Sequence, residues 1–186
     1  MHSIPTSSKL LAGLFLAGLL LPSLCVAQSR VAGEHELKAA FVFNFARFIE
    51  WPDSAFAADG QWFRICVAGS SQTVDLLDQV TADKTLAGRK VQVRLVKDND
   101  PKLRECQILL VESGSPQPFL QAIRDTSVLT VGNGTPFIQN GGIIDFTKEQ
   151  DTIHFEINPE LAQRSQLKIS SKLLALARIV RMSPQP

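Results

Sequence analysis

The sequence has no tyrosine and only three histidines and three cysteines among 186 residues. The histidines and cysteines do not have the spacing of a zinc site or a CxxC redox pair. The sequence also contains no GxSxG nucleophile elbow and no P-loop. Nor is one sign of charge in excess, since 19 Lys and Arg face 18 Asp and Glu. Without a basic field to attract phosphates, no nucleic-acid partner is expected. We also predict no catalytic residue set, no metal and no other cofactor.

The chain also lacks an apolar run of the roughly 20 residues that a membrane span needs. A shorter run, Leu10–Leu21, follows the basic Lys9 and precedes Pro22 and the small-residue site at Cys25–Ala27. This order predicts a secretory signal, residues 1–27, that is cleaved after Ala27, and therefore an exported protein. An uncleaved membrane anchor is the alternative. The remainder, residues 28–186, has the length of one domain.

Apolar runs and helix patterns alternate along that remainder. Strands are expected at Phe63–Ala68, Val91–Val96, Cys106–Val111 and Ser127–Val131, helices at about 70–81 and 118–125, a β-hairpin at Ile143–Thr147 and Thr152–Ile157, and a last helix from Ser170 or Ser171 to about Met182. Continuous apolar strands separated by helices indicate a mostly parallel sheet covered on both faces. The predicted fold class is an α/β three-layer sandwich with a C-terminal β-hairpin, flanked by helices.

A first helix is predicted at Glu36–Glu50, ended by Pro52. Helical spacing places Leu37, Phe41, Phe48 and Trp51 on one buried face, which Phe45 and Ile49 widen. Asn44 lies within this stripe, where its amide is expected to satisfy a backbone group, with a ligand contact as the alternative. Phe43 points to the polar side and is either covered by a second layer or exposed as a docking point.

Only two cysteines, Cys66 and Cys106, remain once the signal with Cys25 is removed. A pair in an exported protein forms a disulfide more often than it stays as two free thiols. Cys66 lies in the first predicted strand and Cys106 begins the third, and such strands can be neighbours in a doubly wound sheet. We therefore expect a disulfide. Its role as a structural link or as a redox control input stays open.

Two segments could hold a small ligand. Gly69-Ser70-Ser71, between a strand and a helix, could offer backbone N–H groups to an anion, although the same residues are ordinary at a helix start. Val131–Pro136 follows a strand, where ligands often bind in open α/β sheets, although turn formation explains its glycines equally well. A ligand-binding sensor module is thus the alternative function, and a hydrolase or transferase with an unfamiliar site also stays open. His35 and His154 fit surface or half-buried positions better than ligand sites.

The run KAAFVFNFARFIEWP, Lys38–Pro52, resembles the N-terminal signature of the YfiR-like family of bacterial periplasmic proteins. The resemblance continues through Arg64–Gly69, the strand at Cys106, Gly141–Ile144, Phe155–Asn158 and Leu173–Arg178. It implies a non-enzymatic periplasmic regulator that binds the periplasmic sensor region of an inner-membrane diguanylate cyclase. Lower cyclic di-GMP and restrained biofilm formation would follow. The resemblance also implies release by an outer-membrane lipoprotein and leaves a homodimer open.

In that family a disulfide matching Cys66–Cys106 supports the fold. A second family disulfide near the hairpin has no counterpart here, because Ile143, Ile144 and Phe146 occupy the region. This departure weakens any redox-sensing role that the resemblance would imply.

A partner-binding surface is expected at the last helix. There Leu173, Leu176 and Val180 form the predicted buried stripe, while Leu174 turns toward the face of Arg178 and Arg181. An apolar residue beside arginines is typical of the centre of an interface. The alternative is that Leu174 packs on a neighbouring strand. The predicted partner-binding residues are Glu156, Ile169, Leu174, Arg178 and Phe43.

Overall fold

The computed structural model describes residues 23–56, 60–134 and 136–181, and for residues 23–32 it describes the backbone alone. The predicted signal therefore lies mostly outside the described residues. Among the residues that are described, no helix is both long and apolar enough to cross a membrane.

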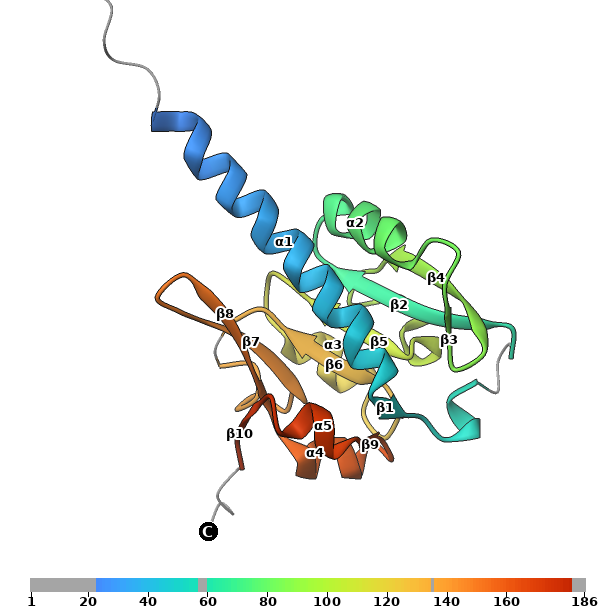
Figure 1. Cartoon of the computed structure of the whole chain (residues 1–186). Coiled ribbons are helices and arrows are strands. Elements are labelled where there is room, and N and C mark those ends of the chain that lie inside the picture. Colours follow the sequence, from blue (N-terminus) through green and yellow to red (C-terminus); the bar gives the residue numbers. More distant parts are fainter. Residues whose placement is uncertain (1–22, 57–59, 135, 182–186) are drawn as a thin grey trace, which may run out of the picture.

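One large sheet organises the protein (Figure 1). Its strands are β2 (Trp62–Ala68), β3 (Thr85–Leu86), β4 (Arg89–Leu95), β5 (Ile108–Val111), β6 (Leu129–Gly132), β7 (Ile144–Glu149), β8 (Thr152–Ile157) and β10 (Arg178–Ile179). Their order across the sheet is β10-β8-β7-β6-β5-β2-β4-β3. Only the β3–β4 and β7–β8 pairs are antiparallel, so the prediction of a mostly parallel sheet with a late hairpin is confirmed.

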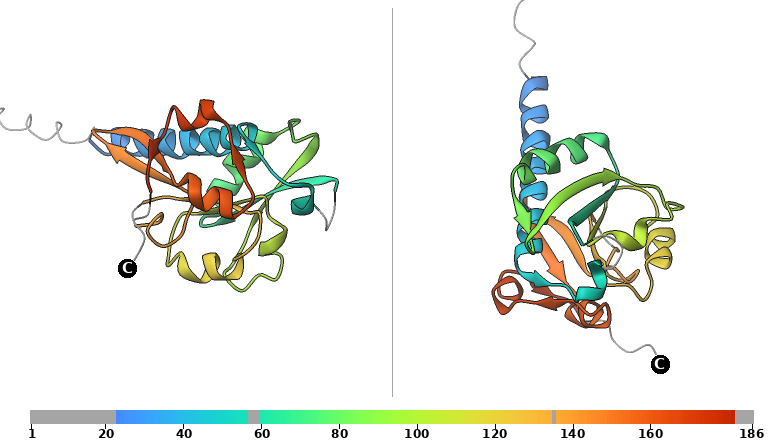
Figure 2. Two further views of the ribbon diagram at one scale, coloured as in Figure 1. Left: turned by 90° about the horizontal axis from the view of Figure 1, so that it is seen from below. Right: turned by 90° about the vertical axis from the view of Figure 1, so that its right-hand side faces the viewer.

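Helices cover both faces of this sheet (Figure 2). The helices are α1 (Ser23–Arg47), α2 (Ser71–Thr81), α3 (Gln117–Ala122), α4 (Pro159–Arg164) and α5 (Ser171–Leu174), with short 3-10 turns η1 (Asp53–Phe56) and η2 (Leu103–Glu105). In β2, Phe63, Ile65 and Val67 join the apolar core under α1 and α2. The alternate residues Cys66 and Ala68 join a second core that includes α3. The three-layer α/β sandwich is therefore confirmed.

The first helix differs from its predicted limits and face. It begins at Ser23 and ends at Arg47, because Ile49–Glu50 forms a strand, β1, that pairs antiparallel with β9 (Lys168–Ile169). Its buried residues are Ala39, Val42, Phe45 and Ala46, about a third of a turn from the predicted stripe. Leu37 is 45% exposed and Asn44 is exposed, so the predictions that they lie in the buried face are wrong.

The last predicted helix is mostly replaced by other structure. It ends at Leu174 after one turn, and Arg178–Ile179 then forms β10, which pairs parallel with β8. Leu176 is consequently 73% exposed instead of buried, while Leu173 is buried as predicted. Hydrogen bonding to the edge of β8 outweighs the weak preference of this short segment for continued helix.

α4 was not predicted, although the sequence holds its start signal. The side chain of Asn158 accepts hydrogen bonds from the backbone N–H groups of Glu160 and Leu161, and Pro159 occupies the first helical position. This is a common helix start.

The hairpin β7–β8 is held against α1 by aromatic packing. Its two-residue turn, Gln150-Asp151, has positive φ at both positions, as the tight turns of hairpins require. Phe146 and Phe155 pair across the strands, and the ring of Phe45 lies 5.7 and 5.0 Å from them, centroid to centroid. Phe41 lies 5.7 Å from Phe155. The hairpin is thus fixed to the first helix and not only to the sheet.

Candidate functional site

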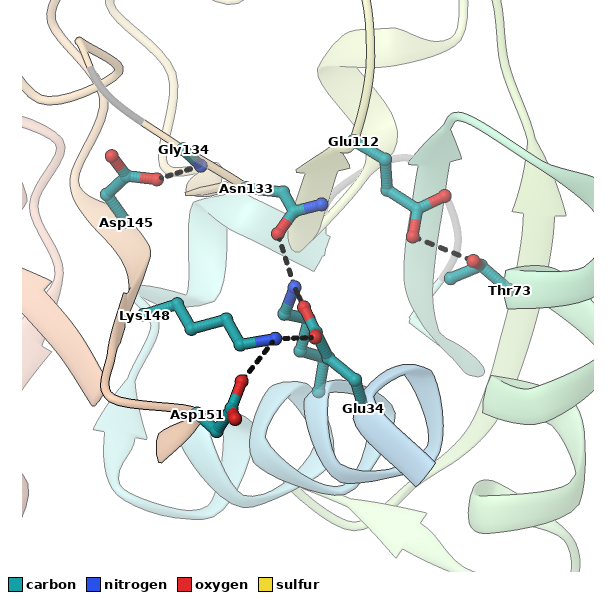
Figure 3. Close-up of polar contacts among 9 residues, drawn as sticks. Glu34, Thr73, Glu112, Asn133, Gly134, Asp145, Lys148 and Asp151 are labelled. Carbon is teal, nitrogen blue, oxygen red and sulfur yellow. Dashed lines mark hydrogen bonds and ion pairs between the residues drawn. The ribbon is translucent and has the colours of Figure 1, made fainter. Parts of the chain in front are cut away.

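The start of α2, where an anion could bind, is occupied by a carboxylate of the protein itself. Ser70 caps the helix by accepting a hydrogen bond from the backbone of Thr73. Glu112, after β5, accepts from the backbone N–H of Ser70 at 3.1 Å. It also accepts from the hydroxyl of Thr73 at 2.7 Å (Figure 3). A Cβ at Gly69 would lie 2.2 Å from an oxygen of Glu112, so the glycine makes room for this carboxylate. The alternative of an anion site at Gly69–Ser71 therefore loses its support.

The end of β6, where a small ligand could sit, is filled by an aromatic ring. The side chain of Phe137 is 3% exposed and lies against both Gly132 and Gly142, where an added Cβ would come within 2.2 Å of it. The hollow that remains beside Asn133, Gly134 and Pro136 measures about 240 Å³. This is below the roughly 300–1,000 Å³ of ordinary ligand pockets. The geometry gives little support to a small-ligand module here.

A network of charged side chains joins the hairpin to α1 (Figure 3). The ammonium group of Lys38 donates to Glu34 at 2.5 Å and to the side-chain oxygen of Asn133 at 2.7 Å. From the hairpin, Lys148 donates to the other oxygen of Glu34 at 3.0 Å and lies 3.6 Å from Asp151. Hydrogen bonds from the two lysines lower the pKa of Glu34. These charges satisfy one another, so the cleft of about 540 Å³ beside them is a mixed-charge surface and not an apolar pocket.

Asp145, the second residue of β7, is a buried carboxylate. It is 1% exposed, and one of its oxygens accepts from the backbone N–H of Gly134 at 2.9 Å. The other oxygen has no hydrogen-bond partner in the described part of the chain. Burial raises the pKa of Asp145, and the charge of Glu156, directly opposite on β8, raises it further.

This raised pKa gives a pH-dependent prediction for Asp145→Asn. The folded state disfavours the ionised form of Asp145. The protonated carboxyl therefore contributes to stability at low pH, and this contribution is lost as the pH rises through the folded-state pKa. As the pH rises from about 4 to 7, the free energy of unfolding of the variant should therefore increase relative to that of the unchanged chain. Chemical denaturation across this range measures the difference. A constant difference would show that Asp145 has an ordinary pKa.

The structure brings two of the predicted partner-binding residues together. Glu156 is 9% exposed in β8, and Arg178 lies beside it in β10, with its guanidinium 3.2 Å from one oxygen of Glu156 and 3.3 Å from Glu149. The side chain of Arg178 is 64% exposed, so this cation remains open to a partner. Glu156 is better placed to hold Arg178 than to touch a partner itself.

The other three predicted residues are partly covered. Ile169 pairs with Ile49 in the small sheet, and Leu174 packs against the main core. The expectation that Leu174 shares a helical face with Arg178 is wrong, because α5 ends at Leu174. Phe43 lies apart, half-buried, with the ammonium of Lys84 4.8 Å from the centre of its ring, which agrees with cover by a second layer.

Two exposed apolar residues of the C-terminal segment were missed. Leu176 is 73% exposed and Ile179 is 39% exposed, on either side of Arg178. We call Leu176, Arg178 and Ile179 the C-terminal surface. Its signal in the sequence was an apolar residue beside arginine, but helical spacing assigned that role to Leu174.

The predicted disulfide is present and links neighbouring strands. Cys66 lies in β2, Cys106 lies two residues before β5, and their Cα atoms are 6.0 Å apart. Arg94, on β4, donates from Nε to the sulfur of Cys66 at 3.3 Å and from Nη2 to the carbonyl of Lys102 at 2.5 Å. Both cysteines are buried, so the disulfide belongs to the core.

The chain is similar to a known family of proteins. A model of the YfiR/HmsC-like family matches residues 35–178. No curated protein matches the chain. Among solved structures, a conserved domain protein from Vibrio cholerae O1 biovar El Tor strain N16961 is 13% identical, with a TM-score of 0.48, and the match covers 65% of this chain and 55% of that one. The match thus spans little more than half of the length of that structure.

The fold and the site define a disulfide-linked, three-layer α/β protein whose exposed features are a mixed-charge cleft and an apolar C-terminal surface. With residues 35–178 matched, the chain belongs to the YfiR/HmsC-like family, which is a regulatory family and not a known family of enzymes.

Proposed function

We propose that this protein is a periplasmic negative regulator that binds the periplasmic sensor region of an inner-membrane diguanylate cyclase. By holding the cyclase inactive, it lowers cyclic di-GMP and restrains biofilm formation. Family membership supports the regulatory role. Release by an outer-membrane lipoprotein belongs to the same proposal. The buried disulfide favours an oxidising compartment such as the periplasm.

The observation that carries the binding role is the C-terminal surface. Leu176 and Ile179 expose apolar side chains on the same short segment that carries the exposed Arg178. An apolar centre next to an arginine is the composition of an interface hot spot. The usual ligand positions of an α/β sheet are instead filled by Glu112 and Phe137, which favours a protein partner over a small molecule.

Repression requires a preference between two states of the partner. A regulator silences a cyclase only if it binds the inactive form more tightly than the active form. A 100-fold shift of that equilibrium needs about 2.7 kcal/mol of differential binding. A surface with two apolar anchors and one charged group can supply this amount.

The proposal is tested with the exported chain and the intact cyclase in membrane vesicles. We expect the chain to bind the cyclase's periplasmic region and to reduce cyclic di-GMP synthesis in proportion to occupancy. The same chain added to the isolated cytoplasmic output domain should change nothing. A folded chain that neither binds nor inhibits in vesicles would contradict the proposal.

A further inference from the structure

The strand β8 has one edge that is only partly paired. On one side, β7 pairs with it over its whole length, from Ile144 opposite Ile157 to Glu149 opposite Thr152. On the other side, β10 pairs only with Glu156 and Ile157. Within the described residues, no strand pairs with Thr152–Phe155 on this outer side, and Figure 1 shows this part of the hairpin projecting from the sheet.

The backbone groups of this edge point outward. The carbonyl oxygen of Ile157 accepts a hydrogen bond from Val180 on the β10 side, at 2.9 Å. Alternate residues of a strand direct their N–H and C=O groups to the same side. Ile153 and Phe155 therefore direct theirs away from β7, while His154 directs its groups toward β7. The carbonyl of Phe155 already accepts from Arg178, because the parallel pairing of Arg178 with Glu156 uses it. The edge therefore offers the N–H groups of Ile153 and Phe155 and the carbonyl of Ile153 to an added strand.

Nothing in the sequence of this edge protects it. Proteins usually guard a free edge with a short strand, lysines or proline. At the opposite end of the sheet, β3 has two residues, follows Lys84 and pairs with Arg89 and Lys90 of β4. The β8 edge, Thr152–Phe155, has twice that length and contains no lysine, arginine or proline. This difference between the two edges indicates that the β8 edge pairs with another strand.

An apolar side chain of α1 lies next to the edge. Phe41 packs on Phe155, and Leu37, one helical turn earlier on the same face, is 45% exposed. Ile153 is half-buried on the same face of β8 as Phe155. A strand added here would meet apolar side chains on the α1 side, and His154 with the Glu156–Arg178 pair on the other. The occupant must therefore alternate apolar and polar residues.

The described residues after β10 do not reach this place. β10 runs parallel to β8, so Val180 and Arg181 follow beyond Ile157, at the end of β8 that lies away from Thr152–Phe155. The sequence after it also contains Pro184 and Pro186, which have no N–H to donate to a ladder. The described part of the chain therefore leaves this edge to another molecule.

We propose that a partner protein adds an extended strand of alternating apolar and polar residues to the β8 edge at Thr152–Phe155, with its apolar side chains against Leu37. The inference takes its partner, the periplasmic region of the cyclase, from the proposed function and rests on it. Main-chain hydrogen bonds would supply affinity, and the alternating side chains specificity.

Ile153→Pro tests this mode of binding. Proline removes the outward N–H and blocks the edge, while the pairing with β7 does not use that N–H. The matched control, Ile153→Val, keeps the backbone donor and most of the apolar side chain. We expect Ile153→Pro to weaken binding of the cyclase's periplasmic region by about tenfold or more and Ile153→Val to leave it unchanged. Thermal unfolding of each variant checks that the hairpin is intact.

A second measurement needs no variant, which matters if Ile153→Pro fails to fold. Amide hydrogen exchange of the unchanged chain, with and without the cyclase region, should slow at Ile153 and Phe155 on binding. The amide of His154, already directed toward β7, is the internal control and should change little.

The outcomes separate the two proposals. Absence of binding by the unchanged chain would overturn the proposed function and this inference together. Binding without slower exchange at Ile153 and Phe155, or equal binding by the proline and valine variants, would overturn the inference alone. A dimer of the unchanged chain that Ile153→Pro converts to monomer, with unchanged cyclase affinity, would show that the edge pairs two copies of this chain and would also overturn it.

Discussion

Replacing both Cys66 and Cys106 with serine is expected to lower the free energy of unfolding by roughly 4 kcal/mol. The disulfide spans a sequence separation of 40 residues, and its loss frees that loop in the unfolded chain. It also joins β2 to the segment before β5, two neighbours at the centre of the sheet. The loss is a large share of the roughly 5–15 kcal/mol that stabilises a domain.

Thermal unfolding with and without a reductant measures this effect. For a domain of this size, the midpoint should fall by about 8–16 °C in the double-serine variant. Reduction of the unchanged chain should produce a similar fall, while the variant should not respond to the reductant. A melting curve that is the same before and after reduction would contradict a structural role for the disulfide.

Leu176→Asp is expected to weaken binding of the cyclase's periplasmic region by roughly 100-fold, which corresponds to about 2.7 kcal/mol. The side chain is 73% exposed, so a charge costs the free protein little, but in the complex it would replace an apolar anchor. Leu174→Asp is a poorer test, because Leu174 packs against the core and its loss would also lower stability.

The matched control is Leu95→Asp. Leu95 is 51% exposed on β4, which five strands separate from β10 in the sheet. The Leu95→Asp substitution places the same charge at an exposed leucine away from the C-terminal surface. Binding measurements should therefore distinguish the two variants while their thermal midpoints stay close to that of the unchanged chain. Equal binding by both variants would show that Leu176 does not belong to the interface.

Most of the fold could be predicted because its signals are local. The apolar runs of β2 and β5, the cap at Ser70 and the alternation of the hairpin are all properties of a few adjacent residues. The disulfide followed from the number of cysteines and the order of their strands. The start of α4 at Asn158-Pro159 carried an equally local signal, so its omission was an error of interpretation.

The other errors depend on distant residues. A helical pattern continues through Ile49, but pairing with Ile169 turns this end of the run into a strand. The same happens at Arg178, which pairs beside Glu156. Helical spacing had placed Leu176 in a buried stripe, and its exposure follows from the loss of that helix.

The sequence by itself determined the fold class, the likeness to a family and the covalent link between Cys66 and Cys106. Only the tertiary structure decided which surfaces remain available. It placed Glu112 at the start of α2 and Phe137 over two glycines, and within the described residues it left part of the outer edge of β8 without a paired strand. The reason is that apolar periodicity, a local pattern, indicates which side chains are buried. Whether a surface is covered depends on the packing of segments that lie far apart in the chain.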